Sequence, residues 1–217
     1  MIQLRDITKQ IGNRIVLDHV TAQMSEETVT GFQGINGSGK TMLMRVIAGL
    51  VRPTSGSVSI NGKRLGRDLS MPESMGILIE NPVFLVSYTG LQNLELLASL
   101  KGRPDMAKLR EWLAMVGLDP DDRRKYKKYS LGMKQRLGIA AAVMGEPDVV
   151  LLDEPTNALD ETGLEMLREI VLMQKRRGAI VILASHDRFF LESLADKILV
   201  FEDGHIQTLR QKADVVC

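Results

Sequence analysis

Residues 34–41 read Gly-Ile-Asn-Gly-Ser-Gly-Lys-Thr, a glycine-rich run between a β-prone segment at 28–33 and a helical pattern at 41–50. Glycines let backbone N–H groups curl around an anion without Cβ clashes, and the following helix directs its positive end at the same anion. The run fits a phosphate-binding loop, in which two glycines flank four residues before Lys and Ser or Thr. The sequence therefore predicts a nucleoside triphosphate site and a P-loop NTPase fold.

The residue types within this loop suggest distinct roles. We assign Lys40 to the β- and γ-phosphates and the Thr41 hydroxyl to a Mg²⁺ ion. The alternative is a glycine-rich turn that binds nothing, which the strand before the run and the helix after it disfavour. The predicted nucleotide-binding residues here are Gly34, Ile35, Asn36, Gly37, Ser38, Gly39, Lys40, Thr41 and Met42.

A second motif places two carboxylates after an apolar run. Residues 149–152 are Val-Val-Leu-Leu, and Asp153 and Glu154 follow. Ligands of open α/β sheets bind at the carboxyl ends of the strands. We therefore predict Asp153 as a Mg²⁺ ligand and Glu154 as the general base that polarises the attacking water. The alternative is an acidic helix start before Pro155, which the presence of the phosphate loop in the same chain disfavours.

The order of elements predicts the architecture. Residues 1–33 carry short strands around a Gly12-Asn13 turn, and no strong strand signal occurs from about 90 to 145. Continuous apolar strands then alternate with helices, which is typical of a parallel sheet covered on both faces. We expect one α/β domain over 1–217, with a mostly parallel core sheet, an N-terminal antiparallel β subdomain and a helical lobe inserted at about 83–145.

Composition excludes several classes of protein. The 217 residues are 44% hydrophobic and 25% charged, which are values of a globular domain. The formal net charge of +1 disfavours nucleic-acid binding through bulk charge. We expect no transmembrane span, no signal peptide and, with Cys217 as the single cysteine, a reducing compartment. The basic run at 123–129 is read as a solvated loop, with RNA binding as its alternative.

Three further motifs point to one family. Residues 129–136 read Tyr-Ser-Leu-Gly-Met-Lys-Gln-Arg, residues 157–160 read Asn-Ala-Leu-Asp, and His186 follows an apolar strand. Together with the first two motifs, in this order, they resemble the nucleotide-binding subunit of ATP-binding cassette (ABC) transporters over essentially the whole chain. The resemblance implies that Ser130 and Gly132 close on the γ-phosphate of a nucleotide held by the other subunit. It also implies that His186 hydrogen-bonds that phosphate and the water.

The sequence departs from the family pattern at three places. Met133 and Lys134 replace the usual ending of the signature, a variant that looks like the cassettes of bacitracin- and lantibiotic-type exporters. Glu80 stands where the family usually has a glutamine that touches Mg²⁺, so we expect Glu80 to be a third metal contact. Ile11 stands where an aromatic residue usually stacks on adenine, which makes it the expected but atypical base contact.

The resemblance implies binding and hydrolysis of ATP with Mg²⁺, with Glu154, His186 and Lys40 as catalytic residues. Two ATPase subunits would sandwich two nucleotides and drive substrate through a separate transmembrane permease. The ATPase subunits themselves would be cytoplasmic and bind peripherally to the inner face of the membrane. The variant signature suggests export of a peptide or antibiotic, by analogy. One alternative is a non-transport cassette that acts on nucleic acid or ribosomes. Another is a clamp that binds ATP without hydrolysing it. We expect no nucleic-acid partner.

Overall fold

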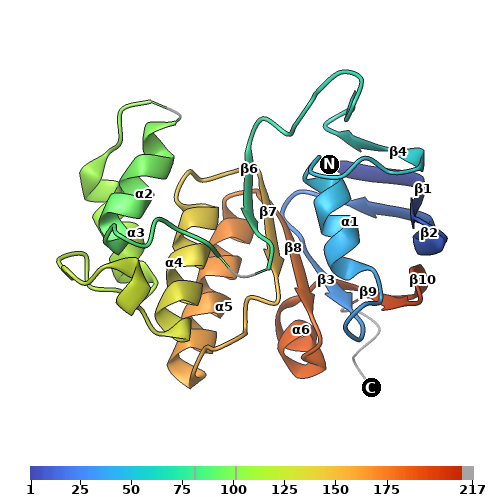
Figure 1. Ribbon diagram of the computed structural model, residues 1–217. Coiled ribbons are helices and arrows are strands. Elements are labelled where there is room, and N and C mark those ends of the chain that lie inside the picture. The colour runs from blue at the N-terminus through green and yellow to red at the C-terminus, as the bar shows by residue number, and fades with distance from the viewer. Residues whose placement is uncertain (81, 101, 212–217) are drawn as a thin grey trace.

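The computed structural model describes residues 1–80, 82–100 and 102–211, so that Cys217 lies outside the described residues. Within them the strands form two sheets, ordered β2-β1-β4-β5 and β10-β9-β3-β8-β7-β6. Figure 1 shows the first sheet at one end of the molecule and helices α2 and α3 at the other. The larger sheet lies between them and carries the predicted motifs.

The smaller sheet is the predicted antiparallel subdomain. Strands β1 (Ile2–Ile11) and β2 (Arg14–Met24) form a hairpin. Strands β4 (Ser55–Ile60) and β5 (Lys63–Arg64) extend the sheet beyond β1. Its apolar side chains are buried against helix α1 and the larger sheet, where they form one cluster with Phe32 and Ile182.

The larger sheet is parallel except at one edge. Strand β3 (Val29–Gln33) pairs in parallel with both β8 (Ile180–Ser185) and β9 (Lys197–Glu202), and β7 (Val149–Asp153) lies between β8 and β6 (Met75–Leu78). Strand β10 (His205–Gln211) is antiparallel to β9. Every residue of β7 and β8 is buried, which explains why both strands are apolar up to their last residues, Asp153 and Ser185.

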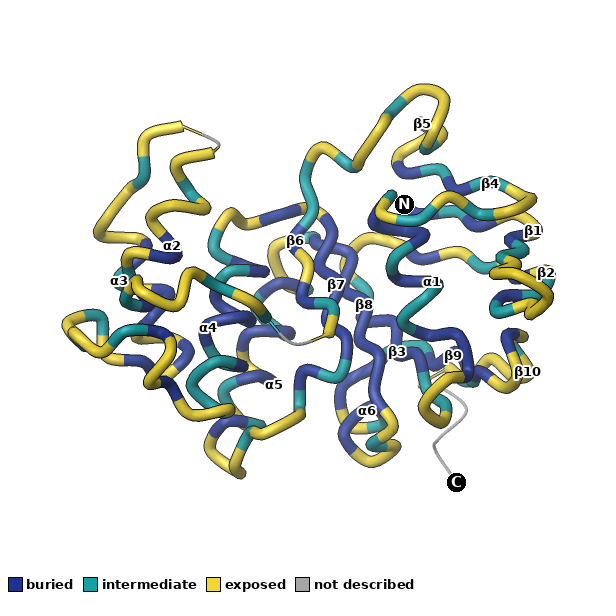
Figure 2. The backbone as a smooth tube through the Cα atoms, viewed as in Figure 1, coloured by how far each residue is buried: buried dark blue, intermediate teal, exposed yellow. Residues whose placement is uncertain are grey.

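Helices cover both faces of this sheet, as predicted. Helix α1 (Lys40–Ile47) packs on the face that also meets the antiparallel sheet. Helices α4 (Leu131–Val143), α5 (Glu161–Arg176) and α6 (Arg188–Leu194) pack on the other face. Figure 2 shows buried backbone concentrated in the parallel strands and the adjoining helices, with exposed loops around them.

The lobe consists of α2 (Gly90–Ser99), α3 (Met106–Met115) and the short 3₁₀ turn η1 (Tyr126–Lys128). Each α-helix has a side-chain N-cap: Thr89 forms a capping box with Gln92, and Asp105 accepts two backbone N–H groups. Trp112 and Leu94 join the core cluster that includes α4. No helix among the described residues is long and apolar enough to cross a bilayer.

Candidate functional site

The phosphate loop connects β3 to α1, and close packing requires glycine at two of its positions, Gly34 and Gly39. A Cβ on Gly34 would lie 2.6 Å from the Phe201 carbonyl oxygen. Gly39 has φ 109°, a backbone conformation that other residues rarely adopt, and its Cβ would lie 3.0 Å from the Val16 carbonyl oxygen. The loop is therefore held against the neighbouring strands, with its backbone curled in front of α1.

The turn between β9 and β10 supports this loop from behind. The Gly204 N–H donates to the Ser38 carbonyl at 3.1 Å, and the Gly204 carbonyl accepts from the Asp18 N–H at 3.0 Å. Gly204 itself has φ 83°. The sequence does not reveal this contact with the phosphate loop, because it joins segments more than 160 residues apart.

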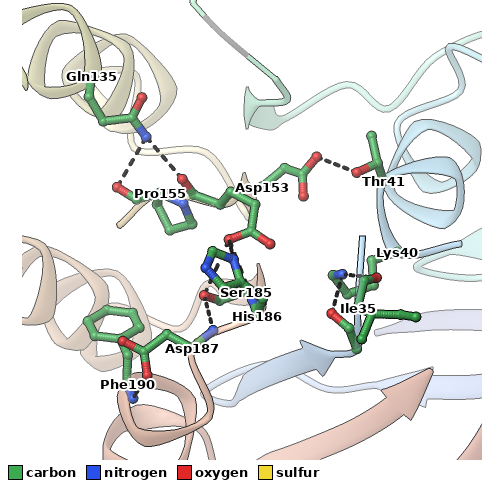
Figure 3. Close-up of polar contacts among 12 residues, drawn as sticks. Ile35, Lys40, Thr41, Gln135, Asp153, Pro155, Ser185, His186, Asp187 and Phe190 are labelled. Atoms are coloured by element: carbon green, nitrogen blue, oxygen red, sulfur yellow. Dashed lines mark hydrogen bonds and ion pairs between the residues drawn. The ribbon is translucent and has the colours of Figure 1, made fainter. Parts of the chain in front are cut away.

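Lys40 is a buried cation inside the loop. Its ammonium group donates to the carbonyls of Gly34, at 2.6 Å, and Ile35, at 2.9 Å. Burial lowers the pKa of Lys40, and the nearby charges of Glu154 and Asp153 act in the opposite direction. The ammonium group is thus held where the loop curls, beside Ile35 (Figure 3) and close enough to Asp153 at the end of β7 and to the adjacent Glu154 for both charges to act on it.

Thr41 and Asp153 meet beside Lys40. The Thr41 hydroxyl donates to Asp153 Oδ2 at 2.6 Å, while Oδ1 is buried and has no hydrogen-bond partner among the described residues. Burial raises the pKa of Asp153, and the Thr41 hydrogen bond lowers it in part. A hydroxyl beside a carboxylate oxygen that lacks a partner is the oxygen donor set that Mg²⁺ prefers, so these residues fit the predicted ion.

Glu154 and His186 form the next pair. Glu154 Oε2 lies 2.8 Å from His186 Nδ1, whereas Oε1 is buried without a partner among the described residues. The pair joins the ends of β7 and β8, because the Glu154 N–H donates to the Ala184 carbonyl at 2.8 Å. The charge of Glu154 also acts on the pKa of Lys40, so the pair lies near the buried ammonium group. The structure therefore brings together the predicted catalytic residues.

Glu80 lies at the edge of this group. Its carboxylate is 61% exposed and forms an ion pair with Arg45, which is one helical turn after Thr41. The charge of Glu80 still contributes to the raised pKa of Asp153. Its role as a metal contact remains a prediction. Sequence analysis missed its Arg45 partner.

Three further predicted nucleotide contacts, Ser130, Gly132 and Ile11, lie at the ends of helices or strands. Ser130 Oγ caps α4 by accepting the Met133 N–H at 3.2 Å. A Cβ on Gly132 would lie 2.8 Å from the Ala158 carbonyl oxygen, so α4 starts in close contact with the 157–160 segment. Ile11 is 53% exposed at the end of β1. Ser130 is exposed as well and accessible to another molecule.

Sequence analysis also missed Gln135, which is 7% exposed on α4. Its amide nitrogen lies 3.3 Å from the Glu154 carbonyl oxygen and 3.1 Å from that of Pro155. The only signal in the sequence was a polar amide on the buried side of a helix that continues with Leu-Gly-Ile-Ala-Ala-Ala-Val at 137–143. This signal does not say which groups the amide contacts.

Comparison with known proteins identifies the family. The profile of the ABC transporter family matches residues 17–157. The chain is 42% identical over 208 residues to the ABC transporter ATP-binding protein YybJ of Bacillus subtilis strain 168, which covers 96% of this chain and 95% of YybJ. It is 36% identical to the bacitracin transport ATP-binding protein BcrA of Enterococcus faecalis, over 95% of this chain and 68% of BcrA. A lantibiotic transport ATP-binding protein, SrtF of Streptococcus pyogenes, is also 36% identical, over 95% of this chain and 89% of SrtF.

A solved structure agrees with these relatives. The fold superposes with a TM-score of 0.87 on a dimeric ATP-binding cassette in a post-hydrolysis state bound to ADP and Pi. The two chains are 25% identical, and the match covers 98% of this chain and 99% of that one. The resemblance drawn from the motifs, its bacitracin- and lantibiotic-type branch and the P-loop fold are confirmed. This chain belongs to the ABC transporter family and is one of its ATP-binding, ATP-hydrolysing subunits.

Proposed function

We propose that this subunit hydrolyses Mg²⁺-ATP between two copies of the chain and thereby drives export of a peptide-type antibiotic through a separate permease. The observation that carries the proposal is the convergence at the carboxyl ends of β3, β7 and β8. There a buried Lys40, the Thr41–Asp153 pair and the Glu154–His186 pair face one another. The substrate class rests on the names of BcrA and SrtF.

The geometry supports a division of labour within the site. Lys40 and the loop N–H groups would hold the phosphates, and Thr41 with Asp153 would hold Mg²⁺, which when bound neutralises charge on the β- and γ-phosphates. Glu154 Oε1 is free to accept the proton of the attacking water. His186 Nδ1 holds Oε2 and thereby orients the carboxylate.

The second copy would complete the site. Ser130 and Gly132 lie at an exposed helix start whose N–H groups favour an anion. Leu131 between them is 72% exposed. The solved relative described above is a dimeric cassette, which supports the same assembly here.

The permease would dock in a groove of about 840 Å³ between the lobe and the end of β6. Its lining includes Val83, 89% exposed, and Leu100, 79% exposed, together with Arg45 and Glu80. The groove would hold a cytoplasmic segment of this permease, because the named relatives are transport ATP-binding proteins. The subunit would then lie on the inner face of the membrane. The nucleic-acid alternative finds no support among these relatives.

Three experiments test the proposal. Purified protein should hydrolyse ATP only with Mg²⁺, and the Glu154→Gln variant should elute as an ATP-dependent dimer in size-exclusion chromatography. A photo-crosslinking residue at Val83 should capture a membrane protein in cells, whereas the same residue at Ile15, which is 49% exposed on β2, should not. Equal capture at both positions would refute the docking groove.

A further inference from the structure

We propose that Gln135 is a positioning residue for Glu154, and that it transmits the state of the α4 helix start to the carboxylate that activates water. The inference rests on the proposed function, in which Glu154 is the general base. It concerns contacts within one chain. These contacts connect helix α4, whose start would face the second copy, to the turn at Glu154 and Pro155.

The contact geometry is specific. The Gln135 amide is buried, and its nitrogen reaches the carbonyl oxygens of both Glu154 and Pro155. An amide group carries two N–H donors, so it can serve both acceptors. Figure 3 shows the side chain pointing from α4 at this turn, on the side opposite His186. Gln135 therefore holds the main chain of Glu154, and His186 holds its side chain.

Glu154 needs such support because of its backbone. Its φ of 46° lies in the left-handed region that residues other than glycine rarely occupy. The following Pro155 offers no N–H for the turn. Without Gln135 the buried Pro155 carbonyl would lose its side-chain donor and the Glu154 carbonyl would keep only the Asn157 N–H, at 3.2 Å, so the turn would be freer to relax toward ordinary backbone angles. That relaxation would move the Glu154 carboxylate, and displacements of about 1 Å reduce rates by as much as about 100-fold.

Two further contacts join α4 to this segment. Gly132 lies against the Ala158 carbonyl, and the Arg136 guanidinium donates to Asp160 at 2.9 Å. The first two turns of α4 therefore contact the segment 154–160 at both of its ends and in its middle. When Ser130 and Gly132 engage a nucleotide on the second copy, a shift of α4 would reach Glu154 through Gln135. Occupancy of one site would thus prepare hydrolysis at the other.

Gln135→Met is the test, because methionine keeps the volume of the side chain and removes its donors. We expect kcat to fall by about 10- to 100-fold, with the Kd for a fluorescent ATP analogue within about twofold of wild type. The Hill coefficient for ATP should fall toward 1. Adding the substitution to Glu154→Gln should leave the ATP-trapped dimer intact, because binding does not need Gln135.

Gln174→Met is the matched control. Gln174 is also a buried amide, on α5, but it lies 14 residues and therefore about 21 Å along the helix axis from Asp160. This variant should keep the wild-type kcat and Hill coefficient. If Gln135→Met fails to fold, as judged by thermal unfolding, Gln135→Ala replaces it in the same assays.

Three results would overturn the inference: a kcat within about twofold of wild type in Gln135→Met, a loss of affinity as large as the loss of kcat, or an equal loss in Gln174→Met. These outcomes differ from a failure of the proposed function. In that case Glu154→Gln itself would turn over near the wild-type rate, whatever the behaviour of Gln135.

Discussion

The interior and the rim of the nucleotide site are built differently. In the interior, Lys40, Asp153 and Glu154 are buried or nearly so and are held by contacts within the chain. At the rim, Ile11 and Glu80 are exposed, and each reaches solvent at a turn or strand end. This difference indicates that contacts within one chain already position the residues that bind the phosphates. The residues at the rim take their final positions only when nucleotide and Mg²⁺ bind.

The largest effect should come from the interior. Lys40→Ala should abolish ATP binding, because it removes the buried cation assigned to the β- and γ-phosphates. Equilibrium binding of labelled ATP measures this. Lys63→Ala is the control, since Lys63 is exposed in an ion pair with Glu73 on the small sheet. Wild-type affinity in Lys40→Ala would mean that the interior does not hold the phosphates.

Glu154→Gln should separate binding from turnover. The amide keeps the shape of the side chain but cannot take a proton from water, so we expect kcat to fall by about 10²- to 10⁴-fold while ATP still binds. A phosphate-release assay and the binding assay, run on one preparation, measure both quantities. A rate near that of wild type would remove Glu154 from its role as the base.

The rim should respond more weakly. Glu80→Ala should raise the Mg²⁺ concentration required for half-maximal hydrolysis, and Arg45→Ala should lower it by freeing Glu80 from its ion pair. Exposed ion pairs contribute at most about 1 kcal/mol, so each shift should be about fivefold or less. A magnesium titration of both variants measures the shifts. Identical curves for wild type and both variants would place Glu80 outside the metal site.

The smallest effect is expected where Ile11 would contact the adenine or guanine base of the nucleotide. Stacking on an aromatic ring contributes about 1–3 kcal/mol in nucleic-acid complexes, and Ile11 offers no such ring. We expect ATP and GTP to compete within about tenfold, and Ile11→Tyr to tighten ATP binding by up to about 1 kcal/mol after ordering costs. Competition of GTP against labelled ATP measures both. A strong preference for ATP in the wild type, unchanged in Ile11→Tyr, would mean that the base lies elsewhere.

The interior was readable from sequence because its signals are local. The loop at 34–41 and the apolar run before Asp153 can each be recognised from eight or fewer consecutive residues. The pairing of Glu80 with Arg45 and that of Glu154 with Gln135 could not be predicted from the sequence. Arg45 lies 35 positions from Glu80, and Gln135 lies 19 from Glu154, so their pairing depends on how helices pack on the sheet.

The position of β3 has a consequence for how the protein is made. The phosphate loop lies near the start of the chain, but β3 is flanked by β8 and β9, and Ser38 accepts a hydrogen bond from Gly204. During synthesis, which proceeds at about 5–20 residues per second, these neighbours emerge many seconds after the loop. A ribosome-bound chain therefore carries the complete loop sequence without its flanking strands. We expect the nascent chain to acquire ATP affinity only when β9 and the turn after it have left the ribosome.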